Sequence, residues 1–305
     1  MFHYPIPALE GSLTPEQVHQ LLGNHRAIAR QFKSVVQEKF IADYLLAGRY
    51  PVVGGAVIYP ETGETLYTVD DTEEIGPGGE YPLTVTDQGS YAAARTSKRG
   101  HDTEVYDEAI ASLGIDPVNR GLSKLGNTVI RDVDRAALAV IASKVTKTYK
   151  SAAWSTGEAI VEAVLLAKAS NQVTEASTYD FDTIVLTPLQ FAKVGAYLIN
   201  GGFVPRENGD MLRGKLPIDA LGMTWVTTDH VPVTDPLLVD RDQLGGMGDW
   251  DLKSPGYVRA GNVDTKVSRL GGEDDRDGYR LRARRVTVAV VVDPNAAVRI
   301  TDTGV

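Results

Sequence analysis

The sequence contains no cysteine, and that absence removes several kinds of site at once. Without a thiol the chain can form no disulfide, no thiolate metal centre and no cysteine nucleophile. It also has no apolar run approaching the roughly 18 residues that a membrane-spanning helix requires. Residues 1–11 lack a basic segment followed by an apolar one, so we expect no secretion signal. We therefore expect a soluble protein whose assemblies are held by packing and charge.

Positive charge is also scarce, with 31 lysines and arginines against 40 aspartates and glutamates in 305 residues. The net charge of −9 argues against a dedicated nucleic-acid-binding domain, because neutralising phosphates supplies most non-specific affinity for nucleic acid. A locally basic face on an acidic protein remains compatible with this balance. With 43% hydrophobic residues the chain can bury a substantial core, as one large domain or two of ordinary size.

Each segment that resembles a catalytic or metal-binding motif lacks an essential residue of that motif. Residues 209–215 have the spacing of a phosphate-binding P-loop, but Leu216 stands where serine or threonine must coordinate magnesium. Residues 273–278 mimic half of a calcium loop, yet Arg284 replaces the required bidentate carboxylate. The five histidines show no metal-ligand spacing, and the Asp-His pair at 229–230 fits a strand end beside a turn. We expect no enzyme activity, no cofactor and no metal.

Residues 117–150 carry the longest helical pattern in the chain, with Asp116 expected at the N-cap and Pro117 at the first helical position. Its apolar stripe consists of Val118, Leu122, Leu125, Val129, Val133, Ala136, Val140 and Ile141. Its basic residues fall on another face, at Arg120, Lys124, Arg131 and Arg135. Helical throughout, the element would be roughly 50 Å long at about 1.5 Å per residue. Such a helix needs a large core or neighbouring subunits to lie against.

Helices and extended segments precede this long helix. Thr14 and Gln17 form a capping-box signature that predicts a short helix to residue 22, and a second helix is predicted over 25–47. Strands are predicted at residues 57–59, 65–69 and 91–97. A two-stranded arm of this kind is marginal by itself in water, so we expect it to need a partner surface.

A compact α/β region is predicted after the long helix, from about residue 155 to 250. A capping box at Ser155 and Glu158 opens a helix to about residue 170, and Thr187-Pro188 opens another to residue 199. Strands are predicted in this region at residues 181–186, 222–228 and 237–240. The C-terminal part is predicted to form a long hairpin of strands 257–270 and 279–292, followed by a short strand at 297–301.

An acidic loop separates the predicted arm strands. Its carboxylates, which surround the glycines of residues 76–79, are Asp70, Asp71, Glu73, Glu74 and Glu80. Clustered carboxylates are compatible with a cation site or with general acid and base chemistry. A charge run beside glycines is more often a solvated loop, and we favour that interpretation.

The order of these elements resembles the HK97-like major capsid proteins of tailed bacteriophages. Residues 80–82, 89–100 and 105–108 resemble the returning strand of the family's extended loop and the start of its spine helix. Asp134 stands near a position where the family often has an aspartate in that helix. Residues 183–188, 221–226, 231–232 and 282–296 resemble strands and turns of the axial domain and the closing peripheral strand. The resemblance extends from about Gly54 to the C-terminus.

The resemblance implies an α+β fold in four parts. These are an N-terminal arm (1–53), an extended loop (54–104), a peripheral domain with the spine helix and hairpin (105–154 and 257–292), and an α/β axial domain (155–256 and 293–305). It implies a structural subunit that self-assembles into hexamers and pentamers of an icosahedral shell around double-stranded DNA, bound non-specifically. Such a subunit is made in the host bacterial cytoplasm and resides in the virion. Its other expected partners are portal, scaffolding and decoration proteins, with no membrane.

The resemblance also assigns two surfaces. The extended loop lies over a neighbouring subunit in that family, so inter-subunit contacts are expected at Asp70, Asp71, Glu73, Glu74, Glu80 and Tyr81. The basic stripe of the spine helix, made of Arg120, Lys124 and Arg131, is expected to face packaged DNA.

Two departures from the family and two alternatives remain. Some relatives join a loop lysine covalently to a neighbour's asparagine, but residues 70–82 contain no lysine and Lys98 lies near the loop's base, so we expect no such bond. The loop begins after about 50 residues without a long coiled-coil pattern, so we expect a separate scaffolding protein or a propeptide absent from this sequence.

The alternatives are an encapsulin-like nanocompartment shell around cargo protein and a metal-dependent α/β enzyme using the acidic loop.

Overall fold

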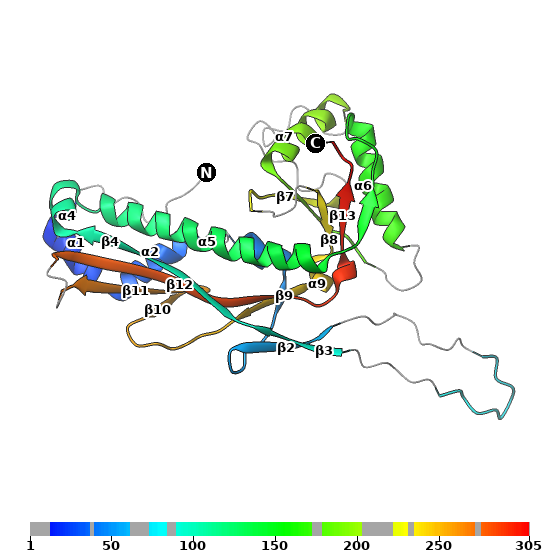
Figure 1. The fold of residues 1–305 in the computed structure, drawn as a ribbon, viewed down its shortest axis with the longest axis horizontal. Helices are drawn as coiled ribbons and strands as arrows, with labels where there is room; N and C mark the ends of the chain where they lie inside the picture. Colours follow the sequence, from blue (N-terminus) through cyan, green and yellow to red (C-terminus); the bar gives the residue numbers. More distant parts are fainter. Residues whose placement is uncertain are drawn as a thin grey trace.

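The computed structural model describes residues 13–36, 40–61, 73–83, 90–172, 179–202, 222–230, 235–271 and 276–304. A long helix, α5 (Asp116–Lys144), crosses the molecule along one face of a twisted sheet (Figure 1). The first two helices of the chain lie at one end of α5, and a second sheet with its own helices stands at the other end (Figure 1). A two-stranded arm projects from the side of the large sheet away from α5 (Figure 1). The chain is thus α+β, as the sequence predicts.

Helix α5 (Asp116–Lys144) is the predicted long helix, but it is shorter than expected. Its helical conformation ends at Val145, and residues that were predicted to continue it form strand β5 (Thr148–Lys150). Strand β5 pairs in parallel with the C-terminal strand. Its backbone groups therefore take part in sheet pairing instead of continuing the helix. Ile115, not Asp116, occupies the N-cap, and it makes no side-chain capping bond. The apolar stripe is otherwise confirmed, with Ala136 and Val140 half-buried at its edge.

The larger sheet has the order β1-β9-β12-β11-β10, with β4 also paired to β12. Its strands are β1 (Gly48–Arg49), β4 (Ser97–Tyr106), β9 (Gly245–Asp249), β10 (Val258–Ala260), β11 (Val263–Leu270) and β12 (Gly278–Val291). The predicted C-terminal hairpin is confirmed as the antiparallel pair β11 and β12, although a turn at residues 261–262 divides its first strand. Strands β4 and β9 were not predicted, and neither was the short helix α4 (Asp107–Leu113).

The smaller sheet has the order β5-β13-β8-β6-β7. It comprises β5, β6 (Thr183–Leu186), β7 (Thr224–Thr227), β8 (Leu237–Val239) and β13 (Ala297–Thr301), and it packs with helices α6 (Gly157–Gln172) and α7 (Pro188–Asn200). The helix start predicted at Thr187-Pro188 is confirmed, and the structure adds a capping box there between Thr187 and Gln190. Thr156 rather than Ser155 caps α6, because its hydroxyl accepts from the Ala159 N–H at 3.2 Å.

Three helices precede the larger sheet: α1 (Pro15–Gly23), α2 (His25–Val36) and α3 (Ile41–Leu45). The capping box of Thr14 and Gln17 opens α1 as predicted. The single helix predicted over residues 25–47 is replaced by α2 and α3, and residues 37–39 between them lie outside the described residues. Helix α2 packs against α5, and α3 packs against both α5 and β9. In the part of the chain that the structure describes, no helix combines the length and apolarity needed to cross a membrane.

The core runs continuously from the N-terminal helices, along α5, to the smaller sheet. A satellite cluster seats the arm, because Val57 and Tyr59 pack on Val290 of β12. The arm strands are β2 (Ala56–Glu61) and β3 (Ser90–Arg95), paired antiparallel. The strand predicted at 65–69, the P-loop-like residues and Leu216 lie outside the described residues.

Candidate functional site

The arm has one buried face and one exposed apolar face, as the period-2 alternation of a strand allows. Val57 and Tyr59 point toward the larger sheet and are almost fully buried. On the other face Ile58 is 72% exposed and Tyr91 is 73% exposed. Ile58 pairs with Ala93 and Tyr91 pairs with Pro60, so the outer face is a continuous apolar strip. This outer arm face (Ile58, Pro60, Tyr91 and Ala93) is available to another surface.

The described part of the arm loop is exposed except at Ile75, which is half-buried. Glu73, Glu74 and Glu80 are all exposed, in agreement with a solvated acidic loop. Tyr81 and Leu83 are 83% and 94% exposed, so two large apolar side chains accompany the carboxylates. The predicted contact residues Asp70 and Asp71 lie outside the described residues. Among the described residues no group of three or more carboxylates or histidines is placed to hold a metal ion.

The predicted basic stripe lies on α5, where Arg120, Lys124 and Arg131 are all exposed. At about 100° per residue these three positions fall within an arc of about 40°, so they form one face. Arg131 forms an ion pair with its neighbour Asp132 at 3.4 Å, and both side chains are nearly half exposed. A pair so exposed contributes little to stability, so Arg131 is free to exchange this partner for another anion.

A buried ion cluster connects the N-terminal helices to the larger sheet, and the sequence interpretation missed it. Arg285 of β12, fully buried, donates to both oxygens of Asp43 at 2.8 and 2.7 Å. It also donates to both oxygens of Asp249 in β9, at 2.8 and 3.0 Å. Its guanidinium lies 4.5 Å from the ring centroid of Phe40. One arginine therefore joins three segments that are far apart in sequence.

The charges of this cluster are mutually stabilised. Burial opposes ionisation of Asp43, but hydrogen bonds and charge from Arg285, with help from Arg49, hold the pKa of Asp43 below its ordinary value. The sequence signal was Arg285 itself, which continues the buried alternation of Leu281 and Ala283 along β12. An arginine at a position where the strand alternation predicts a buried side chain indicates a buried carboxylate partner. The sequence does not identify which carboxylate that is.

Asp134 has a separate structural role on the buried side of α5. It is fully buried, and its carboxylate accepts from the N–H of Ala42 at 3.0 Å and of Ile41 at 3.4 Å. Helix α3 has no capping side chain of its own at Phe40, so Asp134 caps it from another helix. Burial raises the pKa of Asp134 to about 6, with a further rise from Asp43, against the two backbone hydrogen bonds and Arg285.

Replacing this carboxyl by an amide tests the raised pKa. Because the folded pKa exceeds the unfolded value, stability from Asp134 is present at low pH and is lost as pH rises from about 4 to 6. In Asp134→Asn the side-chain carbonyl can still accept from Ala42 without ionising. We expect the free energy of unfolding of the variant, relative to the unchanged chain, to rise by about 1–3 kcal/mol across that window. Urea unfolding of both chains at a series of pH values measures it, and a difference independent of pH would contradict it.

Comparison with known proteins decides the identity of this fold. The phage capsid protein family matches residues 90–300, which is more than half of the chain. The chain belongs to the phage capsid protein family. As a capsid protein it is a structural component of the virion and not an enzyme. A search of curated proteins finds no match.

Solved structures agree on the fold of this capsid protein. The virus-like particle from Pyrococcus furiosus matches with TM-score 0.57 and 12% identity, covering 89% of this chain and 97% of that one. The capsid of Cyanophage P-SCSP1u matches with TM-score 0.58 and 15% identity, covering 83% and 85%. A chain of Gordonia phage Cozz matches with TM-score 0.53 and 17% identity, covering 85% of each. At such low identities the likeness establishes the HK97-like fold alone.

Proposed function

We propose that this capsid protein is the major shell subunit, assembling through its arm into hexamers and pentamers of an icosahedral shell around double-stranded DNA. The observation that carries the proposal is the outer arm face, an apolar strip on a projecting two-stranded sheet. A lone pair of strands is weak in water, and its open edges invite uncontrolled pairing unless another surface covers them. A neighbouring subunit that covers the strip satisfies both requirements.

The base of the arm supports a fixed direction of projection. Beyond the packing of Val57 and Tyr59, Lys144 at the end of α5 donates to Glu61 of β2 at 2.6 Å. The arm is thus attached both to β12 and to the spine helix. We propose that its loop, including Glu73, Glu74, Glu80 and Tyr81, contacts the neighbouring subunit, as Asp70 and Asp71 are also expected to do.

The domain division remains part of this proposal. We assign 1–53 to the N-terminal arm, 54–104 to the extended loop, 105–154 and 257–292 to the peripheral domain, and 155–256 and 293–305 to the axial domain. Strand pairing adjusts this division at four strands. Strands β1, β4 and β9 lie wholly or partly within 1–53, 54–104 and 155–256, but they pair in the larger sheet, so we place them with the peripheral domain. Strand β5 lies within 105–154 but pairs with β13 in the smaller sheet, so we place it with the axial domain.

Axial domains would form rings through heterologous contacts, in which two different surfaces of neighbouring subunits meet. Such contacts give a closed ring when the rotation from one subunit to the next divides a full turn evenly. Each contact can be modest because many act together in a closed shell. Two exposed leucines support this part of the proposal, Leu189 of α7 at 69% and Leu165 of α6 at 50% exposed. Portal, scaffolding and decoration proteins are the further partners that we propose.

Imaging the assembled protein tests the proposal. The full chain, expressed alone and with candidate scaffolding proteins, is sedimented, and the fast fraction is examined by electron microscopy. Closed icosahedral particles are the expected result. Phage particles built from this subunit are further expected to contain double-stranded DNA. Small oligomers under every condition would overturn the shell assignment. The likeness to the Pyrococcus furiosus virus-like particle supports a second candidate, a closed shell around cargo protein, which copurifying protein without DNA would favour.

A charge placed on the outer arm face is expected to block assembly without unfolding the subunit. In Ile58→Asp the aspartate replaces a side chain that is 72% exposed in the single chain, so subunit stability changes little. At an inter-subunit contact the same charge would be desolvated without a partner, which is costly. Sedimentation is expected to show subunits in place of particles. Leu113→Asp, at a 56% exposed leucine that ends helix α4, is the control and is expected to leave particles intact.

A further inference from the structure

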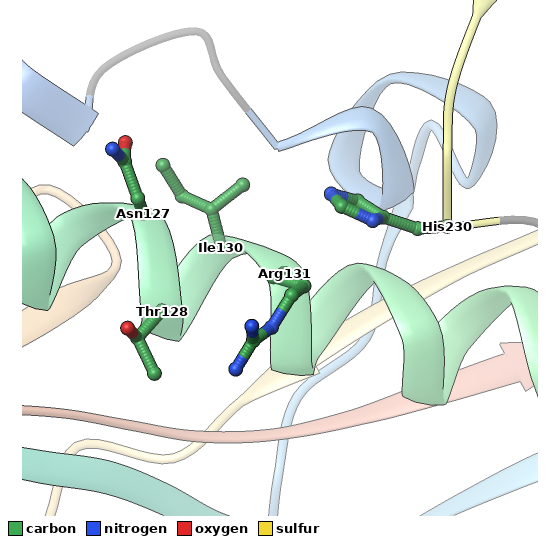
Figure 2. Close-up of a pocket in the computed structure, with 5 residues that line it drawn as sticks. All are labelled: Asn127, Thr128, Ile130, Arg131 and His230. Carbon is green, nitrogen blue, oxygen red and sulfur yellow. The ribbon is translucent and has the colours of Figure 1, made fainter.

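A hollow of about 410 Å³ lies between α5 and the turn that follows β7. Its lining residues are Asn127, Thr128, Ile130 and Arg131 of α5 and His230 of the turn. Figure 2 shows the His230 ring reaching over α5 from that turn, while the other four side chains come from successive turns of the helix. The hollow is therefore built by two parts of the fold, the spine helix and a segment of the smaller sheet.

The lining offers hydrogen-bond donors that the rest of the described chain does not use. Arg131 contacts Asp132 through Nε, and its terminal nitrogens have no partner among the described residues. The ring nitrogens of His230 and the side-chain amide of Asn127 are likewise without partners in the described ranges; His230 uses its backbone N–H on Thr228. Unused cationic and amide donors around one open space fit an anionic ligand.

The hollow continues the basic stripe of α5. Arg131 belongs to both, and Arg120 and Lys124 extend the same face toward the N-terminal end of the helix. From residue 120 to 131 the helix rises about 16 Å at ~1.5 Å per residue. One strand of duplex DNA carries about five phosphates over that length, at ~3.4 Å each along the axis. The stripe and hollow therefore match the spacing of a polyphosphate backbone better than that of a single small anion.

We propose that this hollow binds a phosphodiester group of packaged double-stranded DNA, with Arg131, His230 and Asn127 as donors to the phosphate oxygens. The proposal rests on the proposed function, because it needs this side of α5 to face the shell interior. It adds a site on the turn after β7 to the basic stripe. The contact involves the backbone of DNA only, so it is independent of sequence, as a container for a whole genome requires.

His230 gives the site a pH dependence. Burial lowers its pKa, Arg135 and Arg131 lower it further, and Asp229 and Asp132 oppose them. A phosphate placed among these groups favours the protonated ring, so binding takes up a proton when His230 is neutral in the free protein. Affinity for DNA therefore increases as pH falls through the titration range of His230.

The test measures the affinity of the unassembled full chain for a fluorescein-labelled 30-base-pair duplex of random sequence by fluorescence anisotropy, over a series of salt concentrations. Arg131→Gln is expected to reduce the slope of log affinity against log salt by about 0.9 and the affinity by roughly three- to tenfold. His230→Gln is expected to abolish the increase in affinity between pH 7.5 and 5.5. Arg259→Gln, at a half-exposed arginine of β10 away from the hollow, is the matched control and should leave both properties unchanged. Inorganic phosphate at constant ionic strength should compete with the duplex for the unchanged chain.

Two outcomes separate this inference from the wider proposal. If Arg131→Gln and His230→Gln bind as the unchanged chain does, while Arg120→Glu with Lys124→Glu weakens binding, the hollow is not a site and the stripe stands. If the unchanged chain does not bind the duplex, both the hollow and the stripe are overturned. In either case, shell assembly is judged separately by electron microscopy.

Discussion

Replacing Arg285 by methionine is expected to destabilise the unassembled subunit by about 3–5 kcal/mol, the usual cost of removing one partner from a buried ion pair. The side chain is fully buried and makes four hydrogen bonds to Asp43 and Asp249. Methionine fills much of the volume but leaves two carboxylates in a poorly solvated site. Urea unfolding followed by circular dichroism measures the change. A loss of this size can exceed half of a typical domain's net stability, so failure to accumulate as folded protein is a consistent result.

Two comparisons keep the Arg285 prediction falsifiable. Lys150→Met removes a cation whose pair with Asp302 is exposed, with side chains 83% and 58% accessible, so it should cost less than about 1 kcal/mol. In the triple variant Arg285→Met, Asp43→Asn and Asp249→Asn the orphaned charges are removed, so part of the lost stability should return. If the single Arg285 variant unfolds at the same urea concentration as Lys150→Met, the cluster does not hold the N-terminal helices to the sheet.

Substitution of Gly246 by alanine is expected to cost about 3 kcal/mol or more, because backbone rather than a side chain stands in the way. Gly246 pairs with Gly48 of β1 on one side and with Val290 of β12 on the other. A Cβ at this position would overlap the backbone of Gly48, including its carbonyl oxygen. The strands must separate to accept it, and the β1–β9 pairing should be lost. Urea unfolding, with hydrogen exchange at the β1 amides, measures both effects.

Gly195→Ala is the control for this substitution. Gly195 lies within helix α7, and a Cβ there would meet nothing within 4 Å. Alanine is favoured over glycine in a helix interior, so this variant is expected to gain about 0.5–1 kcal/mol. Equal effects of the two substitutions would mean that the close approach of β1 and β9 carries no energetic cost.

Local chemistry in the sequence was enough to locate the main helices and the C-terminal hairpin. The capping box at Thr14 and the helix start at Thr187-Pro188 depend on residues within four positions, so both are formed as predicted. The apolar stripe of α5 and the alternation along β11 and β12 likewise follow from periods of 3.6 and 2 that no distant contact has to supply. The exposure of the described acidic residues of the arm loop and of the basic residues of α5 could also be predicted, because runs of charged side chains stay in contact with water whatever the tertiary packing.

Tertiary contacts decided what the local patterns left open. Strand β4 is mostly polar, and it was missed because its stability comes from pairing with β12, where Arg280 lies opposite Glu104 and Arg282 opposite Asp102. The end of α5 was misplaced because residues 148–150 gain more from pairing with β13 than from continuing the helix.

The sequence by itself determined the main helices, the C-terminal hairpin and an element order that resembles a phage capsid subunit. The arm-loop contacts and the DNA-facing stripe stay predictions. Only the tertiary structure decided which charges are buried and which segments share a sheet. Arg285 and Asp134 show the reason: each side chain has a partner more than 90 positions away, Asp43 for the first and Ala42 for the second. The Coulomb and hydrogen-bond energies of such pairs depend on distance in space and on burial, and neither quantity can be read from spacing along the chain.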